Sequence, residues 1–150
     1  MSFDKGYLEQ LQATAAGEKY PDTLVETHKI TDGLVMGVFC EIVGGELVNI
    51  TGGSTAYAGV VLRDQAGVAD SELKDGVYES PYTHADIAVK HYVTVQASAG
   101  LTPSYGDDIY VDLNGGNEGF ATNIVGSNIA TTGKFVKVID AGNDIWQIQL

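Results

Sequence analysis

Cysteine is almost absent from this sequence, since Cys40 is the only one in 150 residues. A single cysteine excludes an internal disulfide, so packing or assembly with partners must stabilise the fold. Alternation along "GVFCEIV" puts Cys40 in one row with Val38 and Ile42, and we therefore expect a buried, unreactive thiol. Proline is also scarce and falls outside the centres of the apolar runs, at Pro21, Pro81 and Pro103.

Basic residues are few as well. Eight Lys and Arg stand against twenty Asp and Glu, which gives a net charge of −12. Such a chain repels phosphate backbones and anionic headgroups, so we expect neither nucleic acid nor a membrane as a partner. No run approaches the roughly 20 apolar residues of a spanning helix. The start of the chain, "MSFDKGYLEQLQ", carries charges where a secretory peptide needs an apolar run, so we expect folding in a cytoplasm.

From residue 34 onward the chain consists of short apolar or alternating runs separated by glycine. The 19 glycines suit tight turns with positive φ better than helix interiors. Many short strands without βαβ spacing predict a single all-β domain over residues 34–150, built as a sandwich, jelly roll or small barrel. The expected strands are "LVMGVFCEIV", "GELVNI", "AYAGVVL", "GVYES", "DIAVKHYVTVQA", "DDIYVDL", "KFVKVI" and "DIWQIQL".

The fifth of these runs shows the clearest alternation. Ile87, Val89, Val93 and Val95 share one face, which predicts one half-buried antiparallel strand. His91 falls in the same apolar row, where an imidazole without a partner is costly. A core or edge histidine bonded to a carbonyl is the favoured interpretation, and a ligand or base is the alternative.

The first 33 residues differ from the rest, and we expect them to form an N-terminal arm. Phe3, Tyr7, Leu8 and Leu11 could line one face of a short helix that ends before Pro21. So short a helix needs a surface to lie on. A mobile terminus is one interpretation. We favour an arm that docks on a neighbouring subunit through these four side chains.

The stretch "YVDLNGGNEGF", residues 110–120, raises the question of a cation site. A helix-loop-helix calcium loop counted from Asp112 would need an acid or amide at Gly116, a glycine at Asn117 and a glutamate at Asn123, so the pattern fails at three places. The flanking strands instead predict a hairpin with a primed turn at Asn114-Gly115. Cation binding between Asp112 and Glu118 stays open as the alternative.

Motifs for catalysis are missing. The three histidines, His28, His84 and His91, lack the H-x-H spacing of a cupin-type metal site, and no nucleophile elbow, phosphate loop or H-E-x-x-H motif occurs. The carboxylates Asp107 and Asp108 resemble solubilising acids at the start of a strand. The sequence therefore assigns no catalytic, cofactor-binding or metal-binding residue, and we expect no enzyme and no cofactor.

Tyrosine, in contrast, is plentiful, with eight residues. Five of them could supply amphipathic interface contacts, or could stack on sugar rings in a carbohydrate-binding module. They are Tyr78, Tyr82, Tyr92, Tyr105 and Tyr110.

The order of these segments resembles the structural cement, or decoration, proteins of tailed bacteriophage capsids. The resemblance rests on the leader "AAGEKYPDT", the strands "GLVMGVFCEI" and "AGVVLRD", the middle segment "GVYES", the pair "GDDIYVDLNGG", and the closing "TGKFVKVID" and "WQIQL". It covers nearly the whole chain. The glycine- and asparagine-rich stretch from Asn114 to Asn128 departs from the family pattern.

The resemblance implies a non-enzymatic virion protein with a jelly-roll or β-tulip fold, made in the host cytoplasm. Such proteins sit on the outer capsid surface as dimers or trimers and bridge major capsid proteins. If the arm carries the contact, deletion of residues 1–20 should abolish shell binding and leave the sheet folded. The alternative function is a carbohydrate-binding β-sandwich module of a phage tail or lectin type, and an enzyme on a jelly roll is a third.

Overall fold

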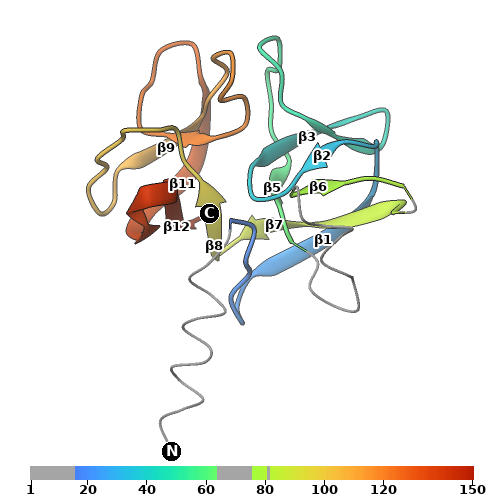
Figure 1. Cartoon of the computed structure of the whole chain (residues 1–150), viewed down its shortest axis with the longest axis horizontal. Helices are drawn as coiled ribbons and strands as arrows, with labels where there is room; N and C mark the ends of the chain where they lie inside the picture. Colours follow the sequence, from blue (N-terminus) through green and yellow to red (C-terminus); the bar gives the residue numbers. More distant parts are fainter. Residues whose placement is uncertain (1–15, 64–75, 81) are drawn as a thin grey trace, which may run out of the picture.

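In the computed structural model, which describes residues 16–63, 76–80 and 82–150, the chain forms strands and one short 3-10 helix. Five strands close into a barrel in the order β1-β4-β3-β5-β7, and five form a second sheet in the order β10-β9-β11-β12-β8 (Figure 1). Strands β2 and β6 pair as a separate ribbon. The all-β prediction is confirmed, and the architecture includes a closed barrel.

The barrel and the ribbon come from residues 24–90, and the second sheet comes from residues 92–149. The barrel strands are β1 (Leu24–Ile30), β3 (Phe39–Val43), β4 (Glu46–Asn49), β5 (Gly59–Val61) and β7 (His84–Lys90). The ribbon strands are β2 (Leu34–Val35) and β6 (Val77–Tyr78). The second sheet contains β8 (Tyr92–Gln96), β9 (Asp108–Val111), β10 (Ala121–Thr122), β11 (Ile129–Asp140) and β12 (Ile145–Gln149), with the helix η1 (Ala141–Asn143) before β12.

Strand β1 lies within residues 1–33, the range expected to form an arm. It pairs antiparallel with β7 along its length and parallel with β4 only at Lys29 and Ile30. Its sequence, "LVETHKI", mixes charged and apolar residues, and its burial pattern follows no strict alternation. The sheet therefore begins at Leu24, ahead of the expected boundary between residues 33 and 34.

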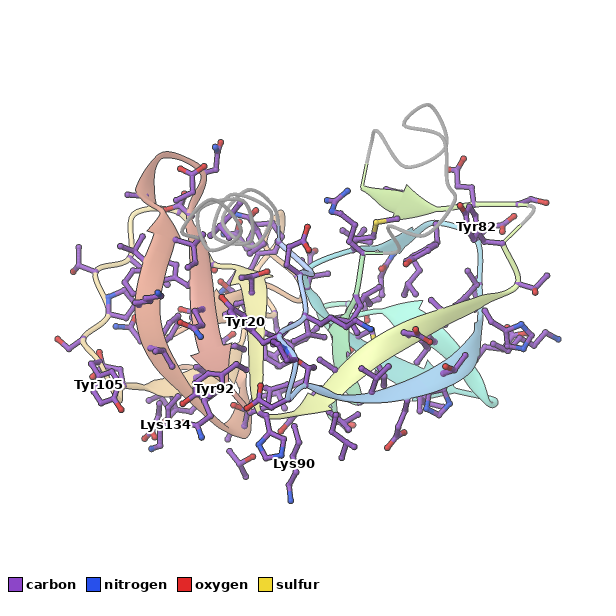
Figure 2. All side chains as sticks on the ribbon, turned by 90° about the horizontal axis from the view of Figure 1, so that it is seen from below. Tyr20, Tyr82, Lys90, Tyr92, Tyr105 and Lys134 are labelled. Carbon is purple, nitrogen blue, oxygen red and sulfur yellow. The ribbon has the colours of Figure 1, made fainter. Side chains whose placement is uncertain are left out.

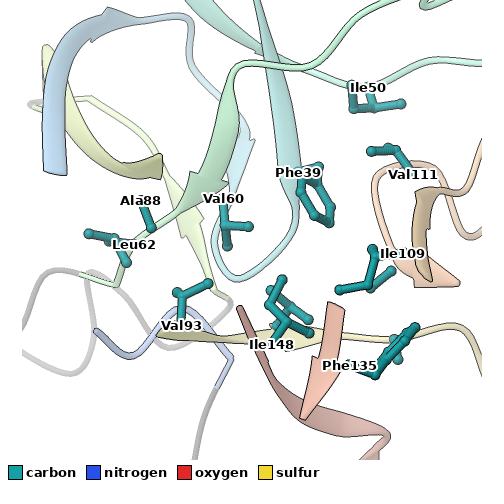
Figure 3. Close-up of a cluster of buried hydrophobic side chains, with 13 residues drawn as sticks. Phe39, Ile50, Val60, Leu62, Ala88, Val93, Ile109, Val111, Phe135 and Ile148 are labelled. Carbon is teal, nitrogen blue, oxygen red and sulfur yellow. The ribbon is translucent and has the colours of Figure 1, made fainter. Parts of the chain in front are cut away.

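Two hydrophobic clusters share the strands of the barrel. One cluster contains Cys40, Val61 and Ile87, together with ribbon residues such as Tyr78. The other cluster contains Phe39, Val60 and Ala88, each of which is adjacent in the chain to one of those three barrel residues. These side chains pack against the second sheet (Figure 3). Because successive side chains of a strand point to opposite faces, the middle strands of the barrel bury both faces. This explains why β5 and residues 87–89 of β7 are apolar without interruption.

The run "DIAVKHYVTVQA" was expected to be one strand, and this expectation is wrong. It contains β7 and β8, which belong to different sheets, and His91 lies between them with φ of 69°. His91 is exposed and does not join the buried row of Val93 and Val95. Its backbone pairs with the last residue, since Leu150 N donates to His91 O at 2.8 Å. A histidine tolerates left-handed backbone better than a β-branched residue does, so the chain can turn here.

The run "LVMGVFCEIV" is also divided, at Gly37. This residue has φ of 77° and lies against Ala16, so that an added Cβ would overlap Ala16 Cβ. Its backbone joins both halves of the molecule, because Gly37 N donates to Val61 O and Gln96 N donates to Gly37 O, each at 2.8 Å. Only glycine combines this backbone angle with so close an approach.

We predict that Gly37→Ala destabilises the protein far more than Gly33→Ala does. Gly33 has a similar φ of 91° but nothing within 4 Å of an added Cβ, so it is a matched control. Both changes carry a cost of about 1–2 kcal/mol for the left-handed backbone. Gly37→Ala adds roughly 1–3 kcal/mol for the steric overlap. Chemical denaturation measures both, and equal losses in the free energy of unfolding would contradict the proposed packing.

Candidate functional site

The histidines are engaged separately in ordinary contacts. His28 Nε2 lies 2.9 Å from Glu26 Oε1, and His84 Nδ1 lies 2.9 Å from Thr83 Oγ1. Within residues 16–63, 76–80 and 82–150, no group of three or more His, Cys, Asp or Glu side chains is placed to hold a metal ion. The acids Asp107 and Asp108 accept from Ser104 N and Lys134 Nζ respectively. Each of these groups thus has a local structural partner.

Asp112 holds the loop between β9 and β10 together. It is 5% exposed; its Oδ2 accepts from Ser98 Oγ at 2.6 Å, and its Oδ1 accepts from Asn114 N and Nδ2 at 2.9 and 2.7 Å. Both carboxylate oxygens are therefore bonded to the protein itself. The loop joins antiparallel strands, as predicted for a hairpin.

The turn type within this hairpin differs from the prediction. The primed turn at Asn114-Gly115 would need positive φ at both residues, whereas the positive angle occurs at Gly116, with φ of 89°. Asn117 N donates to Asn114 O at 3.0 Å, so Gly116 is the third residue of the turn, where a type II turn requires a glycine. The sequence contains two adjacent glycines, and its pattern does not distinguish which one carries the unusual angle.

Cys40 is fully buried, as expected, at 0% exposure. Burial raises the pKa of its thiol to about 12, and the nearby Glu41 carboxylate contributes to the shift. The thiol donates to Gly59 O. A thiol with so high a pKa is not a nucleophile at neutral pH.

The tyrosines expected to supply a binding surface are mostly built into the fold. Tyr78 is 2% exposed and donates to Leu62 O at 2.7 Å, so its assignment to an interface is wrong. Tyr82 packs edge-on against Tyr78, and Tyr92 packs in the same way against Tyr20 (Figure 2). Tyr105, at 81% exposure, is the one strongly exposed tyrosine among the five. The structure therefore offers no cluster of free aromatic rings among these residues.

Residues 16–23 form a strap that joins the two halves of the molecule. Gly17 N donates to Thr94 O of β8 at 2.9 Å, and Arg63 N, just after β5, donates to Gly17 O at 2.9 Å. Glu18 N donates to Thr94 Oγ1 at 2.8 Å, and Lys19 forms a bridge with Val93. In Figure 1 the strap is the blue segment between β8 and β1. Residues 16–23, which fall within the range expected to form an arm, are therefore fixed to the folded body where the two sheets meet.

The sheet edges, which a neighbouring strand could extend, are largely covered. The outer side of β8 pairs with the strap, and Ala97 after β8 forms a parallel bridge with Ala121 of β10. This bridge links the two edges of the second sheet. In the described strands, β1 residues 24–28 pair on one side only, with β7. Covered edges prevent solitary copies from pairing at random.

The family model described as "Structural cement protein (E217 gp24/Pam3 gp6)" matches residues 3–150. The chain belongs to this family. The resemblance seen in the sequence is confirmed, and the location of the cement protein in the phage virion capsid follows from its family.

A solved structure supports the fold of the cement protein. A chain in "The capsid of Myoviridae Phage XM1" superimposes with a TM-score of 0.76 and 22% identity, over 92% of this chain and 90% of that one. No curated protein matches the sequence. A helix long and apolar enough to cross a membrane is absent from the part of the cement protein that the structure describes.

The four side chains expected to contact the capsid, Phe3, Tyr7, Leu8 and Leu11, lie outside the described residues. The strap changes how their role can be tested. Residues 16–20 are hydrogen-bonded to β8 and to the chain after β5, so deletion of residues 1–20 would also remove part of the fold. The earlier expectation that this deletion spares the sheet is revised, and the deletion should end at residue 15.

We predict that Asp112 is a structural residue of the cement protein. Asp112→Ala should lower the free energy of unfolding by about 1–3 kcal/mol, because it leaves the buried hydroxyl of Ser98 without its acceptor and removes the two hydrogen bonds from Asn114. The control Asp108→Ala removes an exposed carboxylate paired with Lys134 and should cost less than about 1 kcal/mol.

Calcium should leave the melting temperature of the wild-type protein unchanged. Titration of the wild-type protein with calcium in a calorimeter should give no heat of binding. A stoichiometric heat that disappears in Asp112→Ala would instead establish a cation site in this loop.

Proposed function

We propose that the protein binds the outer surface of a tailed-phage capsid and stabilises the lattice of major capsid proteins, without enzymatic activity. The observation that carries this proposal is the match of the family model to residues 3–150. The binding partners in this proposal are the major capsid protein and further copies of the chain, as a dimer or trimer. Nucleic acid and membranes are not partners.

The surface and the sheet architecture support this role. Net charge of −12 keeps free copies apart before they reach a shell. The closed barrel and the covered edge of β8 limit pairing between free copies. The two halves share one core cluster and the strap, so the protein can carry load between two contacts as one body.

The N-terminal arm, with Phe3, Tyr7, Leu8 and Leu11, is proposed as one of the contacts with the lattice. A single contact of ~4 kcal/mol has a dissociation constant in the millimolar range, so either of two such contacts is weak on its own. Joined in one molecule, the second forms at high effective concentration, and retention on the shell strengthens greatly. The anchored start at Ala16 and Gly17 fixes where such an arm leaves the folded body.

The proposal is tested with phage heads that lack the protein. Purified protein added back should sediment with the heads, saturate at a fixed ratio, and raise the temperature at which the heads release DNA. Failure to bind heads, combined with a specific hit on a glycan array, would favour the carbohydrate-binding alternative.

The role of the arm is tested separately. A variant lacking residues 1–15 should keep the melting temperature of the wild type within a few degrees, because the strap stays intact, and should bind heads at least about tenfold more weakly. In the full-length chain, replacing Phe3, Tyr7, Leu8 and Leu11 by serine should have the same effect.

Replacing Gln10 and Gln12 by serine is the matched control, since it changes the same segment without removing apolar surface. Undiminished head binding by the variant that lacks residues 1–15 would refute the contribution of the arm.

A further inference from the structure

Charge is absent from three long segments of this acidic chain. The protein has 20 acidic and 8 basic residues, yet residues 47–62, 92–106 and 119–133 contain none of either kind. Two of these segments, residues 47–62 and 119–133, contribute to one end of the molecule. Both segments include loops with exposed residues, so burial in the core does not account for the whole pattern. Depletion of charged residues is a mark of the centre of protein interfaces.

The fold brings these segments to one end of the molecule. The loops after β4, β9 and β10 project on the same upper side in Figure 1. Leu113 connects them: its carbonyl oxygen lies 3.6 Å from a Cβ placed on Gly52, and its amide donates to Asn128 Oδ1 at 3.0 Å. We name residues 50–57, 113–117 and 123–128 the loop end. Two acids that contact it are held by the protein, as Glu118 accepts from Gly116 N and Glu41 accepts from Ser54 Oγ.

Two large apolar side chains stand exposed on the loop end. Ile124 and Val125 are 57% and 58% exposed, and they are adjacent in the chain. Asn128 fixes the loop that carries them, because its Nδ2 donates to Ile124 O and its N donates to Val125 O, each at 3.0 Å. Ile124 N donates to Thr122 Oγ1 at 3.2 Å. A loop held in this way loses little entropy when its tip is buried by a partner.

We propose that the loop end docks on the capsid shell, with Ile124 and Val125 entering an uncharged, apolar depression on the shell protein. This inference rests on the proposed function and names the surface that performs it. The shell protein is the partner that fits, since an uncharged contact lets a protein of charge −12 approach without bringing its acids against the shell.

Other partners fit this surface less well. A second copy would bring two bodies of charge −12 together at an end that has no basic residue to offset them. A sugar would need a free aromatic ring, but the ring of Tyr57 in this loop packs edge-on against Phe39 with centroids 5.5 Å apart. An anionic membrane surface is repelled by the acids nearby.

The test compares double variants in the head-binding experiment. Ile124→Asp with Val125→Asp should weaken binding by about tenfold or more, because a charge would be buried in an apolar contact. Ile42→Asp with Val43→Asp is the matched control: it changes an adjacent Ile-Val pair, exposed by 44% and 56%, at the tip of the β3-β4 hairpin. This control should bind like the wild type. Circular dichroism and melting temperatures verify that both variants are folded.

A second pair of variants tests the chemistry of the partner. Ile124→Lys with Val125→Lys should lose binding as the Asp variant does, whereas Ile124→Val with Val125→Ile should retain it. Tighter binding by the Lys variant would show an acidic partner surface and overturn the proposal. Wild-type-like binding by both charged variants would also overturn it, while failure of the wild type itself to bind heads would refute the proposed function. Loss of self-association in the Asp variant, with head binding intact, would assign the loop end to a second copy and overturn docking on the shell.

Discussion

The structure depends on the burial of both faces of the middle barrel strands. Val60 and Ala88 face the second sheet, while Val61 and Ile87 belong to the cluster of the barrel and its ribbon. Burial of an aliphatic side chain contributes on the order of 1.5–3 kcal/mol, and here each strand contributes to two clusters at once. The barrel and the second sheet therefore cannot separate without exposing apolar surface of the barrel. Gly37 and the strap complete the same contact with backbone hydrogen bonds.

Much of the fold could be predicted from local patterns. Apolar runs such as "AGVVL" identified strands correctly, because burial on both faces leaves a continuous apolar signature. The division of "DIAVKHYVTVQA" at His91 could not be predicted, since alternation continues across the turn and a left-handed histidine has no distinctive sequence signal. Strand β1 was missed because its sequence, "LVETHKI", lacks alternation, and because its main partner, β7, is far from it in the chain. Such pairing is a property of topology and not of local propensity.

The surface illustrates the same limit. The sequence displays the uncharged segments, but their meeting at Leu113 depends on how the loops after β4, β9 and β10 are arranged in space. Conversely, several tyrosines looked available in the sequence and are packed in the structure, as Tyr78 shows. In the proposed function, the net charge of −12 opposes association of free copies, while the small end without charge is left for a specific contact.

The strap also has a mechanical consequence. Its residues Gly17, Glu18 and Lys19 lie alongside β8, joined by hydrogen bonds and a bridge that run across the chain direction. A pull applied at Ala16 along the strap would load these bonds in shear, all at the same time, instead of peeling them apart one by one. Bonds that share a load in parallel resist more force than bonds broken in series. If the N-terminal arm contacts the shell as proposed, a pull from the shell would therefore be spread over β8 and the chain after β5, and the folded body would resist it as one unit.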